Sequence, residues 1–256
     1  MDSAPGNLSL KFGLIGRHID YSFSRSYFTE KFKSEGLSHS YVNFDIADLT
    51  KFEAIIKYTP HLKGLNVTIP YKEQIIPLLD ALDTAAQEIG AVNTIKIGAD
   101  NALKGFNTDY IGFKNSLKPY LNKHHDRALI LGTGGASKAV AYSLKQLDIA
   151  FSFASRQPKH HLDYNYHDLN ETIITNHTII INCTPLGTFP RIEECPDIPY
   201  EFINNKHLLY DLIYNPKETK FLMYGKSHGA NTINGLNMLK LQAEAAWDIW
   251  NTPNSF

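Results

Sequence analysis

The chain has 256 residues, and its 25 Lys and Arg against 26 Asp and Glu give a formal net charge of −1 with His neutral. This balance excludes the strongly basic surface with which proteins bind nucleic acid regardless of sequence. Hydrophobic residues make up 43% and charged residues 20% of the chain, which is typical of a globular protein and not of a disordered one. We expect one or two packed domains.

The N-terminal segment and the cysteines bear on the compartment. Residues 1–10 have neither a basic start nor an apolar run, and nowhere do about 18 apolar residues follow one another, so neither a signal peptide nor a membrane span is predicted. Cys183 and Cys195 have no CxxC partner, which favours neither a zinc site nor a disulfide framework and fits a reducing compartment. We therefore expect a soluble cytoplasmic protein, as a monomer or homodimer, with no nucleic-acid or membrane partner.

Short apolar runs that alternate with helix-like stretches predict βα units and a mainly parallel sheet. In chain order the strand-like runs are 12–15, 41–44, 64–69, 128–131, 149–154, 178–181 and 208–212. Apolar stripes at helical spacing cover 50–58, 137–147 and 236–250, and a further helix is expected over 110–121. Residues 91–107 should form a hairpin, because apolar or β-branched runs flank the turn-forming Gly98, Asp100 and Asn101. The predicted fold class is α/β.

A domain boundary is predicted near Asp109, where a polar turn precedes the helix 110–121. The polar run 122–127 after Pro119 then leads into the first strand of a second sheet. The last helix could pack back on the first domain. The expected domains are therefore 1–109 with 236–256, and 110–235.

The clearest local motif is a strand, a glycine turn and a helix start over residues 129–137. Gly132 permits a tight turn, and Gly134 lets the backbone approach a phosphate to which the first amides of the helix can donate. Ser137 stands where the usual fingerprint has Gly or Ala. The motif predicts a pyrophosphate site, although a purely structural glycine turn is the alternative.

The end of the next strand indicates which dinucleotide would bind. NAD sites usually have an Asp or Glu there for the ribose 2′-hydroxyl, whereas this chain has Ser155, Arg156 and Gln157. Arg156, with Lys159 nearby, offers cations that suit a 2′-phosphate and favours NADP. The alternative is that Arg156 is a solvated loop residue.

Two polar turns carry candidate proton-transfer groups. Lys72 ends the run 66–72, which follows a strand and is expected to open a helix, so the ammonium would lie at the carboxyl end of a strand, where α/β sheets bind ligands. Asp109 ends the turn 105–109. Alone, these residues could be a solvated helix lysine and a helix N-cap. Together they could move a proton to or from an alcohol oxygen, with burial lowering the lysine pKa and the carboxylate raising it.

A series of motifs in chain order covers nearly the whole sequence. They are the runs 13–16 with 22–24, 66–72, 90–94, 105–109, 132–136, 182–187, 211–216 and 235–242. Together they resemble the shikimate dehydrogenase family. The resemblance implies NADP-dependent reduction of 3-dehydroshikimate to shikimate in aromatic amino-acid biosynthesis, by a substrate-binding and catalytic domain (1–109 with 236–256) and a Rossmann-like NADP-binding domain (110–235), with the active site in the cleft.

The resemblance also implies roles for individual residues. Lys72 and Asp109 would be the catalytic pair and also contact the substrate. The other substrate contacts would be Ser22, Ser24 and Tyr214 on the carboxylate side and Thr68, Asn93 and Gln242 at the ring hydroxyls. The cofactor contacts would be Gly132, Thr133, Gly134, Gly135 and Ala136 at the pyrophosphate, Ser155 and Arg156 at the adenosine phosphate, and Leu212 and Gly235 beside the nicotinamide.

The sequence departs from the family pattern at the serine pair and at the phosphate site. Tyr21 and Arg25 replace the usual His and Pro, and Ser155 and Gln157 flank Arg156 where the family has Asn and Thr. A paralogue that also oxidises quinate, with NAD or NADP, and a nucleotide-binding module without catalysis stay open as alternatives. No metal is expected, because the adjacent histidine pairs 124–125 and 160–161 have no acidic residue at ligand spacing, and hydride transfer is the work of the cofactor.

Overall fold

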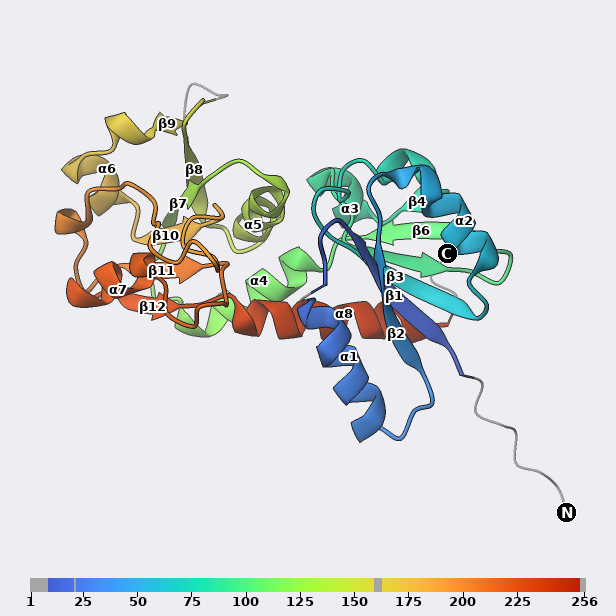
Figure 1. Ribbon diagram of the computed structural model, residues 1–256. Coiled ribbons are helices and arrows are strands. Elements are labelled where there is room, and N and C mark those ends of the chain that lie inside the picture. The colour runs from blue at the N-terminus through green and yellow to red at the C-terminus, as the bar shows by residue number, and fades with distance from the viewer. Residues whose placement is uncertain (1–8, 21, 159–162, 254–256) are drawn as a thin grey trace, which may run out of the picture. The chain divides into compact units, whose positions relative to one another are not determined.

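The computed structural model describes residues 9–20, 22–158 and 163–253, so Tyr21, Lys159 and the histidine pair 160–161 lie outside the described residues. The chain divides into two compact units (Figure 1). The first unit comprises residues 1–108 with 243–256, and the second comprises residues 109–242. The division therefore falls immediately before Asp109 and again inside the last helix, after Gln242.

The first unit is built on one six-stranded sheet. Its elements are β1 (Lys11–Gly16), α1 (Phe23–Ser34), β2 (Ser40–Asp45), α2 (Phe52–Tyr58), β3 (Leu62–Val67), β4 (Ala81–Leu82), α3 (Thr84–Ile89), β5 (Thr94–Ile97), β6 (Leu103–Phe106) and the end of α8 (Leu236–Asn251), with 3-10 turns at η1 (Leu49–Lys51) and η2 (Ile76–Leu78). The strand order is β2-β1-β3-β5-β6-β4. Strand β1 pairs in parallel with β2 and β3, whereas β5 pairs antiparallel with β3 and β6. The predicted hairpin over 91–107 is confirmed as β5 and β6.

The end of α8 closes one face of this sheet through Trp250. Its ring stacks on Phe12 of β1 at 4.8 Å between centroids, and its Nε1 donates to the carbonyl of Ile95 at 3.0 Å. This approach requires Gly64 on β3, where a Cβ atom would lie 2.2 Å from Trp250 Nε1. Burial of the aromatic face therefore fixes the last turns of α8 within the first unit.

The second unit holds a six-stranded sheet in which every pair of neighbouring strands is parallel. Its elements are α4 (Asp109–Leu117), η3 (Lys118–Tyr120), β7 (Arg127–Leu131), α5 (Gly135–Lys145), β8 (Ala150–Ser155), β9 (Tyr164–Asn165), η4 (Tyr166–Asp168), α6 (Glu171–Asn176), β10 (Ile179–Asn182), η5 (Tyr200–Phe202), β11 (Leu208–Asp211), α7 (Lys220–Ser227), β12 (Asn231–Ile233) and the start of α8. The strand order is β12-β11-β10-β7-β8-β9. The order reverses between β7 and β10, and ligands of doubly wound sheets bind at the carboxyl ends of such strands.

Alternation along β7 explains why both faces of this sheet are covered. Ala128 and Ile130 join the buried cluster that contains residues of α5, while Leu129 and Leu131 join the cluster that contains residues of α7. A strand buried on both faces reads as a continuous apolar run, which is how the sequence reads here. The predicted α/β class with a mainly parallel sheet is confirmed.

In the described part of the chain no helix is both long and apolar enough to cross a membrane.

Candidate active site

The serine pair lies where the chain leaves β1 and enters α1. Ser22 is the N-cap of α1, and its hydroxyl oxygen accepts from the amide of Arg25 at 3.4 Å. Asp45, at the end of β2, holds the loop between β1 and α1, because its carboxylate accepts a hydrogen bond from the amide of Ile19 at 3.1 Å. Ser22 and Ser24 are half-buried, and Arg25 is exposed. The loop therefore presents two hydroxyls at the carboxyl end of β1.

Thr68 lies at the carboxyl end of the neighbouring strand β3. Its amide donates to the carbonyl of Ile15 at 2.9 Å. A Cβ atom on Gly16 would lie 2.5 Å from Thr68 Cγ2, so the glycine at the end of β1 lets the threonine side chain pack against the strand end. Thr68 thus lies at the carboxyl end of β3, next to the carboxyl end of β1 where the serine loop starts.

Lys72 lies on a turn and not at the start of a helix, so the expectation that it opens one is wrong. Residues 72–75 form turns, and the 3-10 helix η2 follows them. Pro77 gives the reason, because a proline inside an α-helix lacks the backbone donor and its ring clashes with the carbonyl four residues earlier, here Glu73. The half-buried Lys72 is still anchored, since its carbonyl accepts from the amide of Val92 at 2.7 Å.

Asn93 and Thr108 form a buried pair next to this turn. The amide of Thr108 donates to Asn93 Oδ1 at 2.7 Å, and Asn93 Nδ2 donates to Thr108 Oγ1 at 3.0 Å. Asn107 Nδ2 donates to the carbonyl of Ala91 at 2.9 Å. The turn that leads to Asp109 and the turn that carries Lys72 are therefore both hydrogen-bonded to the segment 91–93.

In the second unit, Asp109 and Gln242 lie on two helices in close contact. Asp109 is the first residue of α4, and Gln242 lies on α8, where its Nε2 donates to the carbonyl of Leu239 at 3.0 Å; both side chains are buried. One turn after Asp109, a Cβ on Gly112 would lie 2.5 Å from the carbonyl oxygen of Met238 and 3.0 Å from the backbone nitrogen of Gln242. Gly112 was not among the predicted residues, and its only signal was a glycine within a helical pattern, which a packing reason often explains.

The predicted pyrophosphate turn follows β7 and caps α5. Gly132 has a φ of +96°, in the region that favours glycine, and Gly134 is the N-cap of α5 with a φ of −76°. Apart from the neighbours of Gly134 in the chain, no heavy atom of the described residues lies within 4 Å of a Cβ placed on it, so the described structure leaves the space beside the first amides of α5 open to a ligand. Thr133, Gly135 and Ala136 are half-buried.

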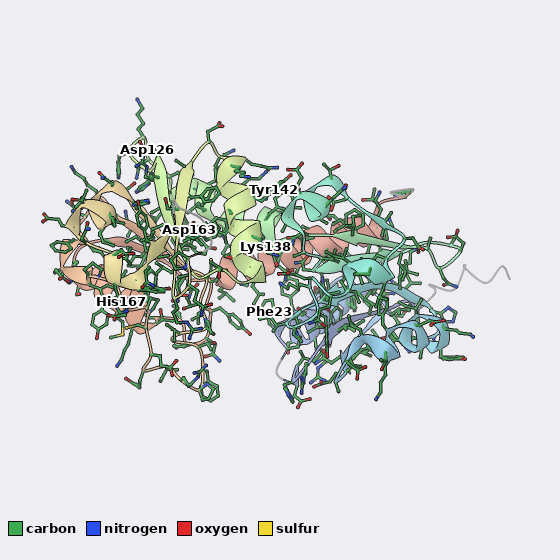
Figure 2. The ribbon with its side chains drawn as sticks, turned by 90° about the horizontal axis from the view of Figure 1, so that it is seen from above. Phe23, Asp126, Lys138, Tyr142, Asp163 and His167 are labelled. Carbon is green, nitrogen blue, oxygen red and sulfur yellow. The ribbon has the colours of Figure 1, made fainter. Side chains whose placement is uncertain are left out.

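The serine at position 137 is accommodated without disturbing this turn. Its side chain is 1% exposed, and its hydroxyl donates to the carbonyl of Gly134 at 2.6 Å. Further along α5, Lys138 and Tyr142 follow one another on the same helix (Figure 2), and the Tyr142 ring meets that of Tyr110 on α4 edge to face at 5.0 Å. This contact packs α4 against α5.

The end of β8 carries the predicted adenosine-phosphate group. Ser155 is 6% exposed, and among the described residues its hydroxyl has no hydrogen-bond partner. Arg156 is exposed, and its carbonyl accepts from Asn165 Nδ2 at 3.2 Å. Burial raises the pKa of Tyr166 to about 12, an effect that the positive charge of Arg156 opposes. The exposed Arg156 guanidinium at the end of this strand suits a phosphate group.

Leu212 and Gly235, predicted beside the nicotinamide, are in direct contact. A Cβ on Gly235 would lie 2.0 Å from the carbonyl oxygen of Leu212. The buried Asp211 before Leu212 accepts from Asn182 Nδ2 at 3.1 Å and from Thr219 Oγ1 at 2.6 Å. Burial raises the pKa of Asp211 from 3.8 to about 6, although these hydrogen bonds lower it. The ends of β10 and β11 are thereby held together.

Tyr214 lies in the loop after β11 and is 38% exposed. Partial burial raises its pKa. Its assignment to the carboxylate side of the substrate stays a prediction.

Comparison with known proteins agrees with this architecture. Residues 14–95 match the family model described as the shikimate dehydrogenase substrate binding domain. The shikimate dehydrogenase (NADP(+)) of Methanosphaera stadtmanae is 36% identical over 255 residues, which cover 93% of this chain and 90% of that protein. The chain belongs to the shikimate dehydrogenase family.

Solved structures from this family have the same fold. A crystal structure of a shikimate dehydrogenase in complex with NADP+ aligns with a TM-score of 0.85 and 35% identity, over 95% of this chain and 90% of that one. The quinate dehydrogenase of Corynebacterium glutamicum in complex with NAD aligns with the same TM-score at 26% identity, over 95% and 94% of the two chains. Fold alone therefore does not separate the two kinds of enzyme.

The histidine pair at 124–125 contacts backbone groups. His124 Nε2 and His125 Nε2 lie 3.1 and 3.2 Å from the carbonyl oxygen of Lys206, and His125 Nδ1 accepts from the amide of Asn122. Within the ranges that the structure describes, no group of three or more His, Cys, Asp or Glu residues could hold a metal ion. His124 and His125 therefore contact the backbone of neighbouring loops.

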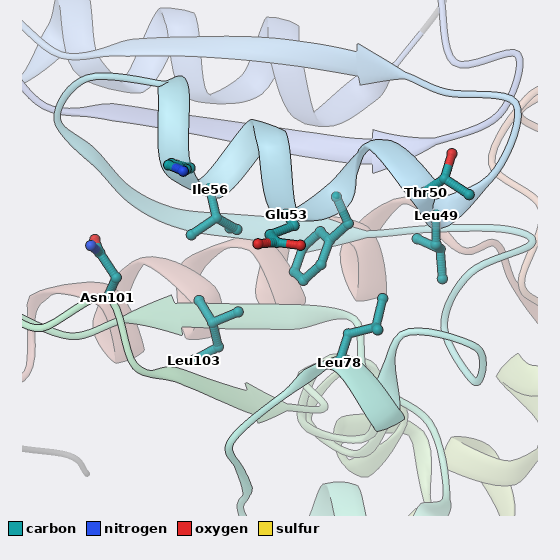
Figure 3. Close-up of a pocket in the computed structure, with 9 residues that line it drawn as sticks. Leu49, Thr50, Glu53, Ile56, Leu78, Asn101 and Leu103 are labelled. Atoms are coloured by element: carbon teal, nitrogen blue, oxygen red, sulfur yellow. The ribbon is translucent and has the colours of Figure 1, made fainter.

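A pocket of about 540 Å³ lies elsewhere in the first unit, beside α2 (Figure 3). Its lining is mostly apolar, with one acidic and one basic side chain, and consists of Leu49, Thr50, Phe52, Glu53, Ile56, Lys57, Leu78, Asn101 and Leu103. None of the predicted site residues lines this pocket.

Proposed function

We propose that this chain catalyses the reversible NADP-dependent reduction of 3-dehydroshikimate to shikimate, as a cytoplasmic enzyme of aromatic amino-acid biosynthesis. Relatives whose alignments cover 93% of this chain are named shikimate dehydrogenase (NADP(+)). The observation that carries the proposal is the segment 91–93, which holds the Lys72 turn through Val92 and the turn before Asp109 through Asn93. Lys72 and the end of the first unit at Thr108 are thus both hydrogen-bonded to the segment 91–93.

Lys72 supplies the proton in this reaction. NADPH, when bound, would supply the hydride to the carbonyl carbon of the substrate. The carbonyl oxygen needs one proton to become the alcohol of shikimate. The Lys72 ammonium donates that proton during reduction and takes it back during oxidation. The Asp109 carboxylate accepts a hydrogen bond from the hydroxyl and so orients it, which is how a positioned acid and base act together.

Neutral donors hold the rest of the substrate. Ser22 and Ser24 donate to the carboxylate, while Thr68, Asn93 and Gln242 bond the ring hydroxyls. A site of buried polar groups rejects an analogue that lacks a hydroxyl, because each group left unpaired costs about 1–3 kcal/mol. The arrangement therefore suits a small acid with several hydroxyl groups.

The second unit fits NADP. The open space beside Gly134 and the amides of the first turn of α5 suit the pyrophosphate. The Ser155 hydroxyl and the Arg156 guanidinium, with no carboxylate at the end of β8, suit a 2′-phosphate. Leu212 and Gly235, whose backbones lie in contact, would border the nicotinamide.

The test is the rate of NADP+ reduction with shikimate, followed at 340 nm, for the wild type and for Lys72→Ala. We expect kcat to fall by about 10²- to 10⁴-fold, the usual contribution of a positioned proton-transfer group. Lys57→Ala on α2, an exposed lysine outside the proposed site, is the matched control and should keep the wild-type kcat. A Lys72→Ala variant with near-normal kcat would show that the mechanism is wrong.

The same assay with quinate and with NAD+ separates the alternatives. Turnover confined to shikimate with NADP+ supports the proposal. Comparable kcat/KM values for quinate, or a preference for NAD+, would assign the chain to the broader quinate/shikimate class, and cofactor binding without turnover would indicate a nucleotide-binding module.

A further inference from the structure

A chain of buried hydrogen bonds runs through the first unit beneath the proposed substrate site. Tyr41 on β2 donates its hydroxyl hydrogen to Asn66 Oδ1 on β3 at 2.7 Å. Asn66 Nδ2 donates to Thr94 Oγ1 on β5 at 3.2 Å, and Thr94 Oγ1 donates to Asn93 Oδ1 at 3.1 Å. These four side chains are at most 6% exposed. Each side chain thus donates a hydrogen bond to the next one, in the direction of Asn93.

Backbone groups fix the direction of this chain. The amide of Thr108 can only donate, so the Asn93 side-chain atom 2.7 Å from it is the oxygen. The carbonyl of Asn93 can only accept, so the Asn66 atom 3.3 Å from it is the nitrogen. Both amide groups are therefore oriented without reference to any ligand.

Thr94 joins the two oriented amides. Its hydroxyl accepts from Asn66 Nδ2 and donates to Asn93 Oδ1. The oxygen of Asn93 then receives donors from Thr94 and from both the amide and the hydroxyl of Thr108. The Asn93 atom suited to donate to a hydroxyl oxygen is therefore the amide nitrogen, which also donates to Thr108 Oγ1 at 3.0 Å.

We propose that Thr94 is a positioning residue, whose hydroxyl, together with the backbone amide of Thr108, holds the Asn93 amide in the orientation that donates to a ring hydroxyl of the substrate. The inference rests on the proposed function, because it assigns Asn93 to the substrate. Thr94 itself is fully buried and acts through Asn93. The cost of losing it should appear in substrate binding and not in the chemical step.

Thr94→Val tests this role because it replaces the hydroxyl by a methyl group at nearly constant volume and keeps a β-branched residue in the strand. We expect KM for shikimate to rise about 3- to 10-fold, in keeping with the loss of one buried hydrogen bond. The kcat and the KM for NADP+ should stay within about twofold, because the variant leaves Lys72 and the second unit unchanged. Thr94→Ser, which keeps the hydroxyl, should restore the wild-type KM.

Two further measurements separate positioning from general destabilisation. In an Asn93→Ala background the effect of Thr94→Val on the shikimate KM should disappear, because residues that act through one another are not additive. Tyr210→Phe, which removes a fully buried hydroxyl that bonds Ser116 at 2.6 Å in the second unit, is the control for lost stability and should leave that KM unchanged. Thermal unfolding of each variant completes the comparison.

The outcomes distinguish the inference from the function on which it rests. A wild type that turns over no shikimate overturns the proposed function and this inference with it. An active wild type with an unchanged KM in Thr94→Val, or an effect that persists in the Asn93→Ala background, overturns the inference alone. If Thr94→Val does not fold, Tyr41→Phe breaks the same chain two steps earlier, and an unchanged shikimate KM in that variant counts against the proposal.

Discussion

Replacing Gly134 by alanine should weaken NADP binding while leaving the fold intact. Gly134 has a φ of −76° and a ψ of −180°, extended values that alanine adopts freely. Beyond its chain neighbours, none of the residues that the structure describes lies within 4 Å of the added Cβ. Alanine at a compatible position stabilises a protein by about 0.4–1 kcal/mol through the unfolded state. Alanine is also a poorer N-cap than glycine, so the two effects oppose each other and the free energy of unfolding should change by less than about 1 kcal/mol.

The cofactor would meet the new methyl group where the pyrophosphate has to approach the backbone. Pushing a phosphate oxygen away from one amide of the α5 N-terminus removes a hydrogen bond to a charged group, which is worth about 1.5–3 kcal/mol. We therefore expect KM for NADP+ to rise by about 10- to 150-fold at saturating shikimate. The kcat at saturating NADP+ should fall much less.

Gly132→Ala is the matched comparison, two residues away in the same turn. Its φ of +96° and the 3.0 Å distance from a new Cβ to Thr184 Cγ2 predict a loss of at least about 1–2 kcal/mol of stability. Steady-state kinetics in NADP+ together with thermal unfolding of both variants distinguish loss of the cofactor site from loss of the fold. A Gly134→Ala variant with the wild-type KM for NADP+ would refute the assignment of this turn to the pyrophosphate.

Two other predictions concern the second unit. Arg156→Gln should lower kcat/KM for NADP+ at least about tenfold and change that for NAD+ little, because only the 2′-phosphate needs the guanidinium; equal losses with both cofactors would contradict this role. Asp211, with a folded pKa of about 6 and an ordinary value of 3.8, is protonated more readily in the folded state, so its contribution to stability is present below pH 3.8 and is lost as the pH rises through 6. Chemical unfolding of the wild type and Asp211→Asn should show their difference in unfolding free energy changing by about 2 kcal/mol between pH 4 and 7, to the disadvantage of the wild type. A difference that does not vary with pH would show that Asp211 ionises normally.

Local sequence patterns predicted several elements because the forces that make them act over a few residues. The hairpin of β5 and β6 followed from two apolar runs around a turn, and the strand–turn–helix of β7 and α5 followed from Gly132 and Gly134. The expected helix at Lys72 failed because Pro77 interrupts it. The rule that proline does not fit inside an α-helix, applied to Pro77 five residues after Lys72, would have excluded the expected helix.

The sequence by itself determined the α/β class, the glycine turn and the candidate residues that the family motifs mark, because alternating burial and turn chemistry are local properties of a chain. Tertiary structure alone decided what those residues touch. Two close approaches join segments that are distant in the chain, Gly112 to Met238 and Gly235 to Leu212. No rule based on residue spacing reveals them. The orientation of the Asn93 amide likewise depends on Thr94 and on the backbone amide of Thr108, since a buried amide is oriented by whichever donors and acceptors the folded chain brings to it.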